Sequence, residues 1–166
     1  AFIWAGRQAP GDPLSAAAMP SVCELLQAYR ATRYQIVEPT AALPVLAEAR
    51  IGSRSPEVDR LLEGHDAGSG VFITAWNPRS QVVPRAGNEA AHRRLEHALR
   101  RLDIRFLAHL GVGADPTWEP EQGLFALDLP RALALDLAVT FGQNAIVLIA
   151  HGQPAELVAT ALMPTD

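Results

Sequence analysis

Hydrophobic positions recur at helical spacing in four segments of the chain. Ser21 and Glu24 have the spacing of a capping box, and Leu25 and Tyr29 then repeat along one face. Gly64 and the glycine at position 142 follow the ends of two further segments, as is common at helix C-termini. The pattern predicts helices over residues 21–31, 55–64, 88–102 and 130–141.

Strand character dominates in seven other segments. Residues 71–75 and 145–150 are almost entirely apolar, which is typical of strands covered on both faces. Apolar residues alternate through 104–110, as expected for a strand with one solvated face. Further strands are predicted over 33–38, 45–51, 124–127 and 157–162.

From residue 71 to 150 the predicted order is β-α-β-β-α-β, the split βαβ arrangement of ferredoxin-like domains. We therefore predict an α+β fold with this core, preceded by an extra helix and hairpin. The last core strand would normally lie at the edge of the sheet, although 145–150 is wholly apolar. Residues 157–162 are expected to pair beyond it as a C-terminal edge strand.

The length of 166 residues, with 49% apolar and 19% charged residues, indicates one globular domain, which we place at residues 19–166. Residues 1–18 contain prolines, a glycine and little periodic apolar surface, so we interpret them as an extension outside the core. They lack the basic and long apolar regions of a signal peptide, and a cytoplasmic location is expected. Cys23 is the single cysteine and, with apolar neighbours, is expected to be buried and inert.

Charge gives no global attraction to nucleic acid. All 14 basic residues are arginines, and 18 acidic residues bring the net charge to −4. No apolar run approaches the roughly 18 residues that span a bilayer, so no membrane association is expected. Basic residues cluster around the third predicted helix, where acidic residues lie between them as on a solvated helix face. They are Arg85, Arg93, Arg94, Arg100, Arg101 and Arg105.

Sequence motifs for the common cofactors are missing. The chain has no lysine for a Walker-type phosphate loop, and no Gly-x-Gly-x-x-Gly joins a strand to a helix. His92 and His97 are five residues apart and therefore on different helical faces, so no metal site is predicted. We predict no cofactor.

Several ordered motifs together resemble a family of small bacterial proteins known as domain of unknown function 3293. They are Tyr29-Arg30-Ala31-Thr32-Arg33-Tyr34, Phe72-Ile73-Thr74-Ala75-Trp76-Asn77-Pro78, Asn88-Glu89, Trp118-Glu119-Pro120 and Phe141-Gly142-Gln143-Asn144-Ala145. The resemblance spans roughly residues 22 to 150 and implies that these motifs belong to one domain. It implies no activity and no catalytic residue.

Polar and aromatic residues at the ends of predicted elements are the candidate ligand-binding residues: Trp76, Asn77, Asn88, Trp118, Gln143 and Asn144. Each also has a structural interpretation. Asn77 can form a turn before Pro78, Asn88 can be an N-cap, and Asn144 can follow a helix C-terminus. The tryptophans can be packing at the rim of the core.

In the predicted topology these residues converge on one end of the sheet, beside the N-terminus of helix 88–102. The first hypothesis is a domain that binds a polar small molecule between Trp76 and Trp118. Glu119 is the candidate catalytic residue, a general base whose pKa would rise if Trp118 shielded it from water. The second is a non-catalytic interaction module that binds an acidic protein or RNA through the arginine-bearing face, or a second copy through a sheet edge.

Overall fold

A computed structural model describes residues 20–165. The predicted extension, residues 1–18, lies outside the described residues. The helices are α1 (Val22–Ala31), α2 (Pro56–Gly64), α3 (Arg85–Arg101) and α4 (Arg131–Thr140), with a short 3₁₀ turn η1 (Pro78–Ser80). The strands are β1 (Arg33–Val37), β2 (Val45–Ala49), β3 (Ser69–Ile73), β4 (Phe106–Val112), β5 (Glu121–Leu127), β6 (Ala145–Ala150) and β7 (Glu156–Ala159).

Local capping places the first two helices where the sequence predicted them. Ser21 and Glu24 form a reciprocal capping box at the start of α1. The Ser55 hydroxyl accepts a hydrogen bond from the Val58 backbone N–H at the start of α2. The prediction was wrong for α3, which begins at Arg85, so Asn88 lies inside the first turn and is not its N-cap.

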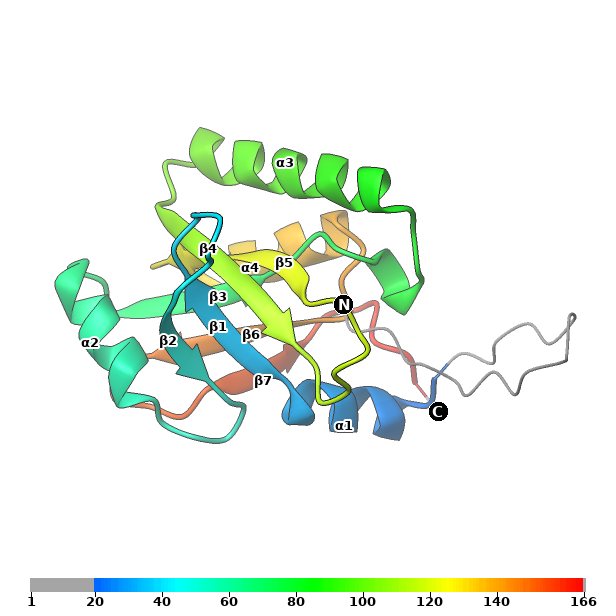
Figure 1. The fold of residues 1–166 in the computed structure, drawn as a ribbon, viewed down its shortest axis with the longest axis horizontal. Helices are drawn as coiled ribbons and strands as arrows, with labels where there is room; N and C mark the ends of the chain where they lie inside the picture. The colour runs from blue at the N-terminus through cyan, green and yellow to red at the C-terminus, as the bar shows by residue number, and fades with distance from the viewer. Residues whose placement is uncertain (1–19, 166) are drawn as a thin grey trace, which may run out of the picture.

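All strand pairs of the seven-stranded sheet are antiparallel, in the order β2-β1-β4-β5-β3-β6-β7 (Figure 1). The fold is therefore α+β, as predicted. The four strands from β3 to β6 along the chain lie side by side in the spatial order β4-β5-β3-β6. Because β3 and β4 both pair antiparallel with β5, they run parallel to each other on either side of it. β7 pairs with the outer side of β6, and the β1–β2 hairpin extends the sheet beyond β4.

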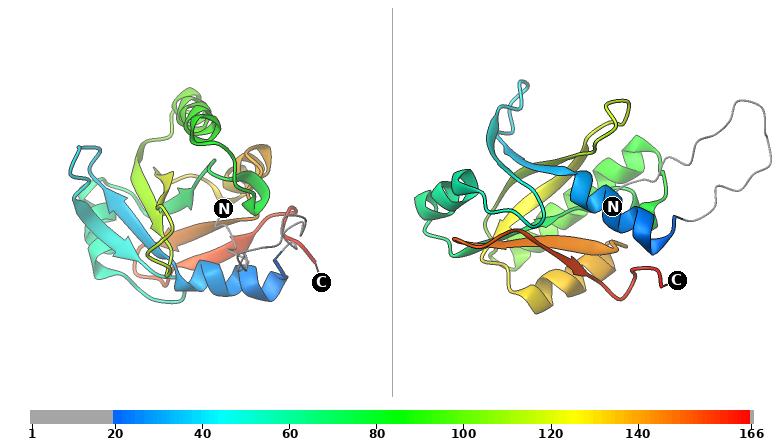
Figure 2. Two further views of the ribbon diagram at one scale, coloured as in Figure 1. Left: turned by 45° about the vertical axis from the view of Figure 1, so that its right-hand side comes forward. Right: turned by 90° about the horizontal axis from the view of Figure 1, so that it is seen from below.

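The sheet curls until its two edges touch at one point. Ile51, just after β2, forms a parallel bridge with Ala155, just before β7. The Gly52 backbone N–H donates to the Ala155 carbonyl at 2.8 Å, and the Ala155 N–H donates to the Ser53 carbonyl at 3.1 Å. This curl gives the sheet a concave inner face and a convex outer face (Figure 2).

Each face buries its own hydrophobic cluster. Helices α3 and α4 cover the outer face through residues such as Leu95, Leu99 and Ala134. The inner face holds Phe72 and Phe125 and is covered at one end by α2. Helix α1 lies at the other end (Figure 1) and contributes a cluster of Leu25 and Tyr29 with Ala145 of β6.

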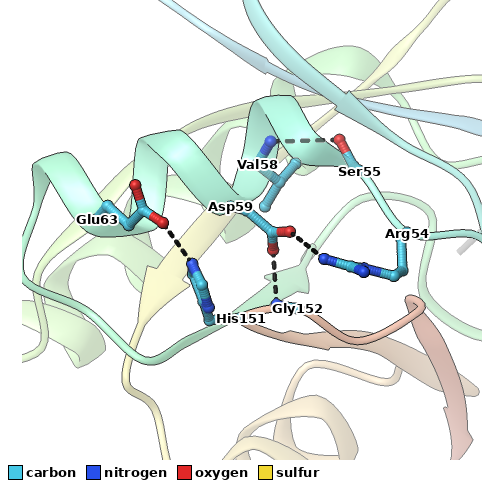
Figure 3. A network of polar contacts seen from close by, with 7 residues as sticks. All are labelled: Arg54, Ser55, Val58, Asp59, Glu63, His151 and Gly152. Atoms are coloured by element: carbon cyan, nitrogen blue, oxygen red, sulfur yellow. Dashed lines mark hydrogen bonds and ion pairs between the residues drawn. The ribbon is translucent and has the colours of Figure 1, made fainter.

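Asp59 on α2 holds the β6–β7 turn against the helix (Figure 3). Its carboxylate accepts the Gly152 backbone N–H at 2.8 Å and lies 3.4 Å from the Arg54 guanidinium. One helical turn further on, Glu63 pairs with His151 at 2.7 Å. These contacts join segments that are far apart along the chain, with Asp59 and Gly152 separated by 93 positions. They therefore reinforce the closure of the curled sheet.

Cys23 corrects another sequence prediction, because its side chain is exposed. Helix α1 buries Leu25 and Tyr29, four residues apart on one face. Cys23 precedes Leu25 by two positions and so points away from that face. Apolar neighbours in sequence therefore did not make it a core residue.

Residues 20–165 include no helix that is long and apolar enough to cross a membrane. Over the same residues, no group of three or more histidine, cysteine or acidic side chains is placed to hold a metal ion.

Candidate functional site

A cavity of about 380 Å³ opens where four segments of the chain meet. Its walls are the C-terminal end of α1, the segment from the exit of β3 to the first turn of α3, the β4–β5 loop, and the start of β5. The structure places five of the seven predicted site residues on these walls: Trp76, Asn77, Asn88, Trp118 and Glu119. The volume suits a small molecule, because ligand pockets typically measure about 300–1,000 Å³.

Asn77 and Asn88 hold each other at the buried side of this cavity. The Asn77 backbone N–H donates to Asn88 Oδ1 at 2.8 Å, and Asn88 Nδ2 donates to Asn77 Oδ1 at 2.8 Å. Asn77 Oδ1 also accepts the Val83 N–H at 3.3 Å. Asn77 and Asn88 are only 4% and 3% exposed. Most of their side-chain donors and acceptors form hydrogen bonds with each other and with the loop.

The loop after β3 has a strained backbone. Asn77, Arg79 and Ser80 have φ values of 45°, 55° and 57°, in the left-handed region that residues other than glycine rarely adopt. Asparagine tolerates this conformation best among them. Such strain persists only where surrounding contacts hold it, and it occurs often at binding sites.

Gln143 and Asn144 supply those contacts from behind the loop. Gln143 Nε2 donates to the Trp76 carbonyl at 3.2 Å, and Asn144 Nδ2 donates to Ser80 Oγ at 3.2 Å. The Arg79 N–H donates to the Gly142 carbonyl at 2.7 Å. Gln143 and Asn144 therefore lie at the predicted end of the sheet, but behind the cavity wall and not on it.

Glu119 is not shielded from water in the way that the sequence analysis predicts for a general base. Its side chain is 67% exposed and forms an ion pair with Arg85, which also pairs with Glu89 at 2.8 Å. Trp118 is itself 37% exposed and does not shield this carboxylate from water. The predicted desolvation is therefore wrong, because the β4–β5 loop leaves the Glu119 carboxylate in water beside Arg85.

Glu121, which the sequence analysis did not single out, is the buried carboxyl group of the site. It is 6% exposed, lines the cavity, and accepts a hydrogen bond from Asn77 Nδ2 at 3.1 Å. Burial raises the pKa of Glu121, and the hydrogen bond from Asn77 opposes this shift. The clue in the sequence is that Glu121, Gly123 and Phe125 stand at alternate positions, and alternate residues of a strand share a face.

Glu121 also borders a much smaller space inside the curled sheet. That space, of about 20 Å³, is lined by Tyr29, Tyr34, Phe72 and His109 among others. The His109 ring stacks on Tyr34 at 5.9 Å between centroids and meets the edge of Phe72 at 4.9 Å. Burial lowers the pKa of His109 to about 4, so the imidazole is neutral at pH 7.

The arginine cluster is on the surface, as its interleaved acids indicated. Arg93, Arg94 and Arg101 are exposed, and Arg100 pairs with Glu96 at 3.4 Å. Arg100 also lies over the Phe106 ring, 5.4 Å from its centroid. Apart from Arg85, none of these arginines reaches the cavity.

Comparison with known proteins gives a match to one family model and no function. Residues 73–146 match the family described as protein of unknown function (DUF3293), which confirms the resemblance noted from the sequence motifs. This range includes β4, β5 and all seven predicted site residues. No curated protein and no solved structure matches the chain.

Proposed function

We propose that this DUF3293 protein is a small-molecule-binding domain, and that its ligand occupies the 380 Å³ cavity. One observation supports this proposal most strongly. Five polar or aromatic residues that the sequence predicts as site residues line the same cavity, although they come from two segments far apart in the chain. Core packing alone gives no reason for such convergence.

The division of the wall into apolar and polar parts supports a small polar ligand. Val82, Val83 and the half-exposed Trp118 offer apolar surface, while Glu121 offers a buried carboxyl group. Pockets of this kind bind the body of a ligand through apolar contacts and orient it through few polar groups. In this proposal Asn77 and Asn88 orient Glu121, and Gln143 and Asn144 hold the loop.

We also propose that the core is ferredoxin-like. The order β4-β5-β3-β6, with antiparallel neighbours and helices α3 and α4 on one face, supports this assignment. The location we propose is the cytoplasm of a bacterial cell, since a single exposed cysteine suits a reducing compartment.

A thermal-shift screen of the full chain against a metabolite library tests the binding proposal. A true ligand raises the melting temperature as its concentration increases. Trp118→Ala is expected to abolish this rise, whereas Val139→Ala, a similarly exposed apolar position on α4, is expected to leave it intact. A library without any stabilising compound would argue against the proposal.

The second candidate is a non-catalytic interaction module. Here the favouring observation is the sheet edge at β2, where Leu43, Val45 and Leu46 are 43–50% exposed. An apolar edge strand is a site where another chain can add. Concentration-dependent dimerisation, measured by sedimentation and lost in Val45→Lys, would support this function through the sheet edge. Loss of RNA or acidic-protein binding after charge reversal at Arg100 and Arg101 would instead favour the arginine-bearing face.

A further inference from the structure

The loop between β4 and β5 forms an outer wall of the 380 Å³ cavity. Five of its residues line the cavity: Gly113, Ala114, Asp115, Trp118 and Glu119. Residues 114–120 are nevertheless all exposed. A segment with the cavity on one side and water on the other opens the cavity when it moves. Residues 113–120 are called the flap below.

The flap has internal structure of its own. The Asp115 carboxylate accepts hydrogen bonds from the Thr117 backbone N–H at 2.9 Å and from Thr117 Oγ1 at 2.7 Å. The Trp118 N–H donates to the Asp115 carbonyl at 3.2 Å. Bonds of this kind between an aspartate and the backbone two residues on fix the shape of a turn. The flap can therefore move as one unit that carries Trp118 with it.

One ion pair joins this unit to the opposite wall. Glu119 pairs with Arg85, the first residue of α3. Over residues 20–165, no other ion pair ties residues 114–120 to another element. Glu89 holds Arg85 at 2.8 Å from the next turn of the same helix. The Arg85 guanidinium is thus oriented by its own helix as it meets Glu119.

This ion pair is easily broken. The side chains of Arg85 and Glu119 are 58% and 67% exposed, so water and dissolved ions screen their attraction. A contact of this kind favours a closed loop only slightly over an open one. Loops that open and close over a site in this way control the entry and release of ligands in many proteins.

We propose that the flap gates the cavity, and that the Arg85–Glu119 ion pair holds it closed. This inference rests on the proposed function, because it concerns how a ligand reaches the same cavity. Glu119 is in this role a positioning residue, which acts on the loop. The open fraction should increase with ionic strength, since the screening length falls from about 10 Å at 0.1 M salt to about 3 Å at 1 M.

The test measures access to the cavity and needs no ligand. Val83→Cys places a thiol on the cavity wall across from the flap, while the exposed Cys23 of α1 does not line the cavity and is the internal reference. The reagent is N-ethylmaleimide, which is small and uncharged. Mass spectrometry of peptides from the labelled full chain gives its reaction rate at each of the two positions. Opening of the flap raises the rate at position 83 alone.

In the Val83→Cys chain, Glu119→Gln is expected to raise the labelling rate at position 83 by about two- to fivefold, the change that fits loss of one exposed ion pair. Arg85→Gln should have the same effect, and the two changes together should add nothing, because each removes the same contact. Raising sodium chloride from about 0.02 M to about 1 M should accelerate labelling similarly where the pair is intact, and not in Glu119→Gln.

Glu156→Gln is the matched control. Glu156 of β7 forms an equally exposed ion pair with Arg131 at 3.2 Å, and neither residue lines the cavity. This change should leave labelling at position 83 as it was. Thermal melts verify that each variant is folded, and the salt response of the chain with both Arg85 and Glu119 tests the gate independently of these variants.

Three results would overturn the gate: equal labelling of position 83 with and without the Glu119 carboxylate, an equal rise at Cys23, or the same rise in Glu156→Gln. Any of these would leave the metabolite screen to decide whether the cavity binds a ligand. Failure of the whole screen alongside the expected labelling would instead reject the proposed function while the measured motion of the flap stands.

Discussion

Asn77 and Asn88, eleven residues apart, are joined by two hydrogen bonds of 2.8 Å that run in opposite directions. One couples the Asn88 side chain to the backbone of the strained loop, and the other joins the two amides. Because Asn77 also donates to Glu121, the pair links the first turn of α3 to the buried carboxyl group of β5. The stability of the cavity wall thus depends on two residues that do not need to touch a ligand.

Replacing Asn88 by alanine should destabilise the protein by about 2–3 kcal/mol, because it leaves the buried Asn77 N–H and Oδ1 without these partners. Urea unfolding followed by circular dichroism measures the change. Arg94→Ala, an exposed position on the same helix, should alter the free energy of unfolding by less than about 0.5 kcal/mol. Equal effects of the two changes would contradict this interpretation of the pair.

Gln143→Ala should lower the free energy of unfolding by about 1–3 kcal/mol, since Gln143 Nε2 donates to the buried carbonyl of Trp76 and to the partly buried carbonyl of Phe141. It should also weaken any ligand of the cavity, because the loop 77–80 loses a contact that holds its strained backbone. The exposed Gln153→Ala is the control for both measurements. Full stability with unchanged ligand affinity would show that this contact does not hold the loop.

Gly123→Ala should destabilise the protein by about 1–3 kcal/mol through overpacking. A Cβ at this position would lie 2.7 Å from both His109 Cδ2 and the backbone carbonyl oxygen of Ile73, and the backbone cannot move aside cheaply. Gly64→Ala, where a Cβ meets nothing within 4 Å, should be nearly neutral. Thermal melts of the two variants compare the sites directly, and a neutral Gly123→Ala would be inconsistent with the close approach of β5 to His109.

The buried His109 should make the folded state less stable as the pH falls from about 6.5 to about 4. Its pKa is about 4 in the folded protein and about 6.5 in the unfolded chain, so the unfolded chain binds more protons between these values. Stability is therefore complete above pH 6.5 and declines towards pH 4, by about 3 kcal/mol in all. Urea titrations at several pH values should show that His109→Gln removes this part of the dependence; parallel curves for both proteins would refute it.

Asp59 also makes the stability of the folded protein depend on pH, in this case through a carboxyl group with a lowered pKa. The hydrogen bond from the Gly152 N–H, with help from Arg54, lowers the pKa of Asp59 below its usual value. A lowered carboxyl pKa contributes stability that is present above the unfolded pKa of about 3.9 and is lost as the pH falls through the folded pKa. Asp59→Asn should cost about 1–2 kcal/mol at pH 7 and progressively less below pH 4. A difference that persisted unchanged at pH 2 would show that charge is not the cause.

Much of the fold could be predicted from local pattern, because capping, periodicity and turns act within a few residues. The capping box at Ser21 and the wholly apolar strand over 145–150 are examples. The covering of β6 by β7 followed from the same reasoning, since an apolar edge strand would be exposed. Parallel β3 and β4 then place their exit loops at one end of the sheet, which is why most of the candidate residues meet at the cavity.

The sequence by itself determined which segments form elements, and at which end of the sheet polar and aromatic residues gather. Only the tertiary structure decided which carboxyl group is buried there. Glu119 and Glu121 are two residues apart, yet one stays in the solvated loop and the other begins β5 and faces inward. The physical reason is that burial depends on where a strand begins and on what the curled sheet and α1 place opposite it, and neither is encoded in the neighbouring residues alone.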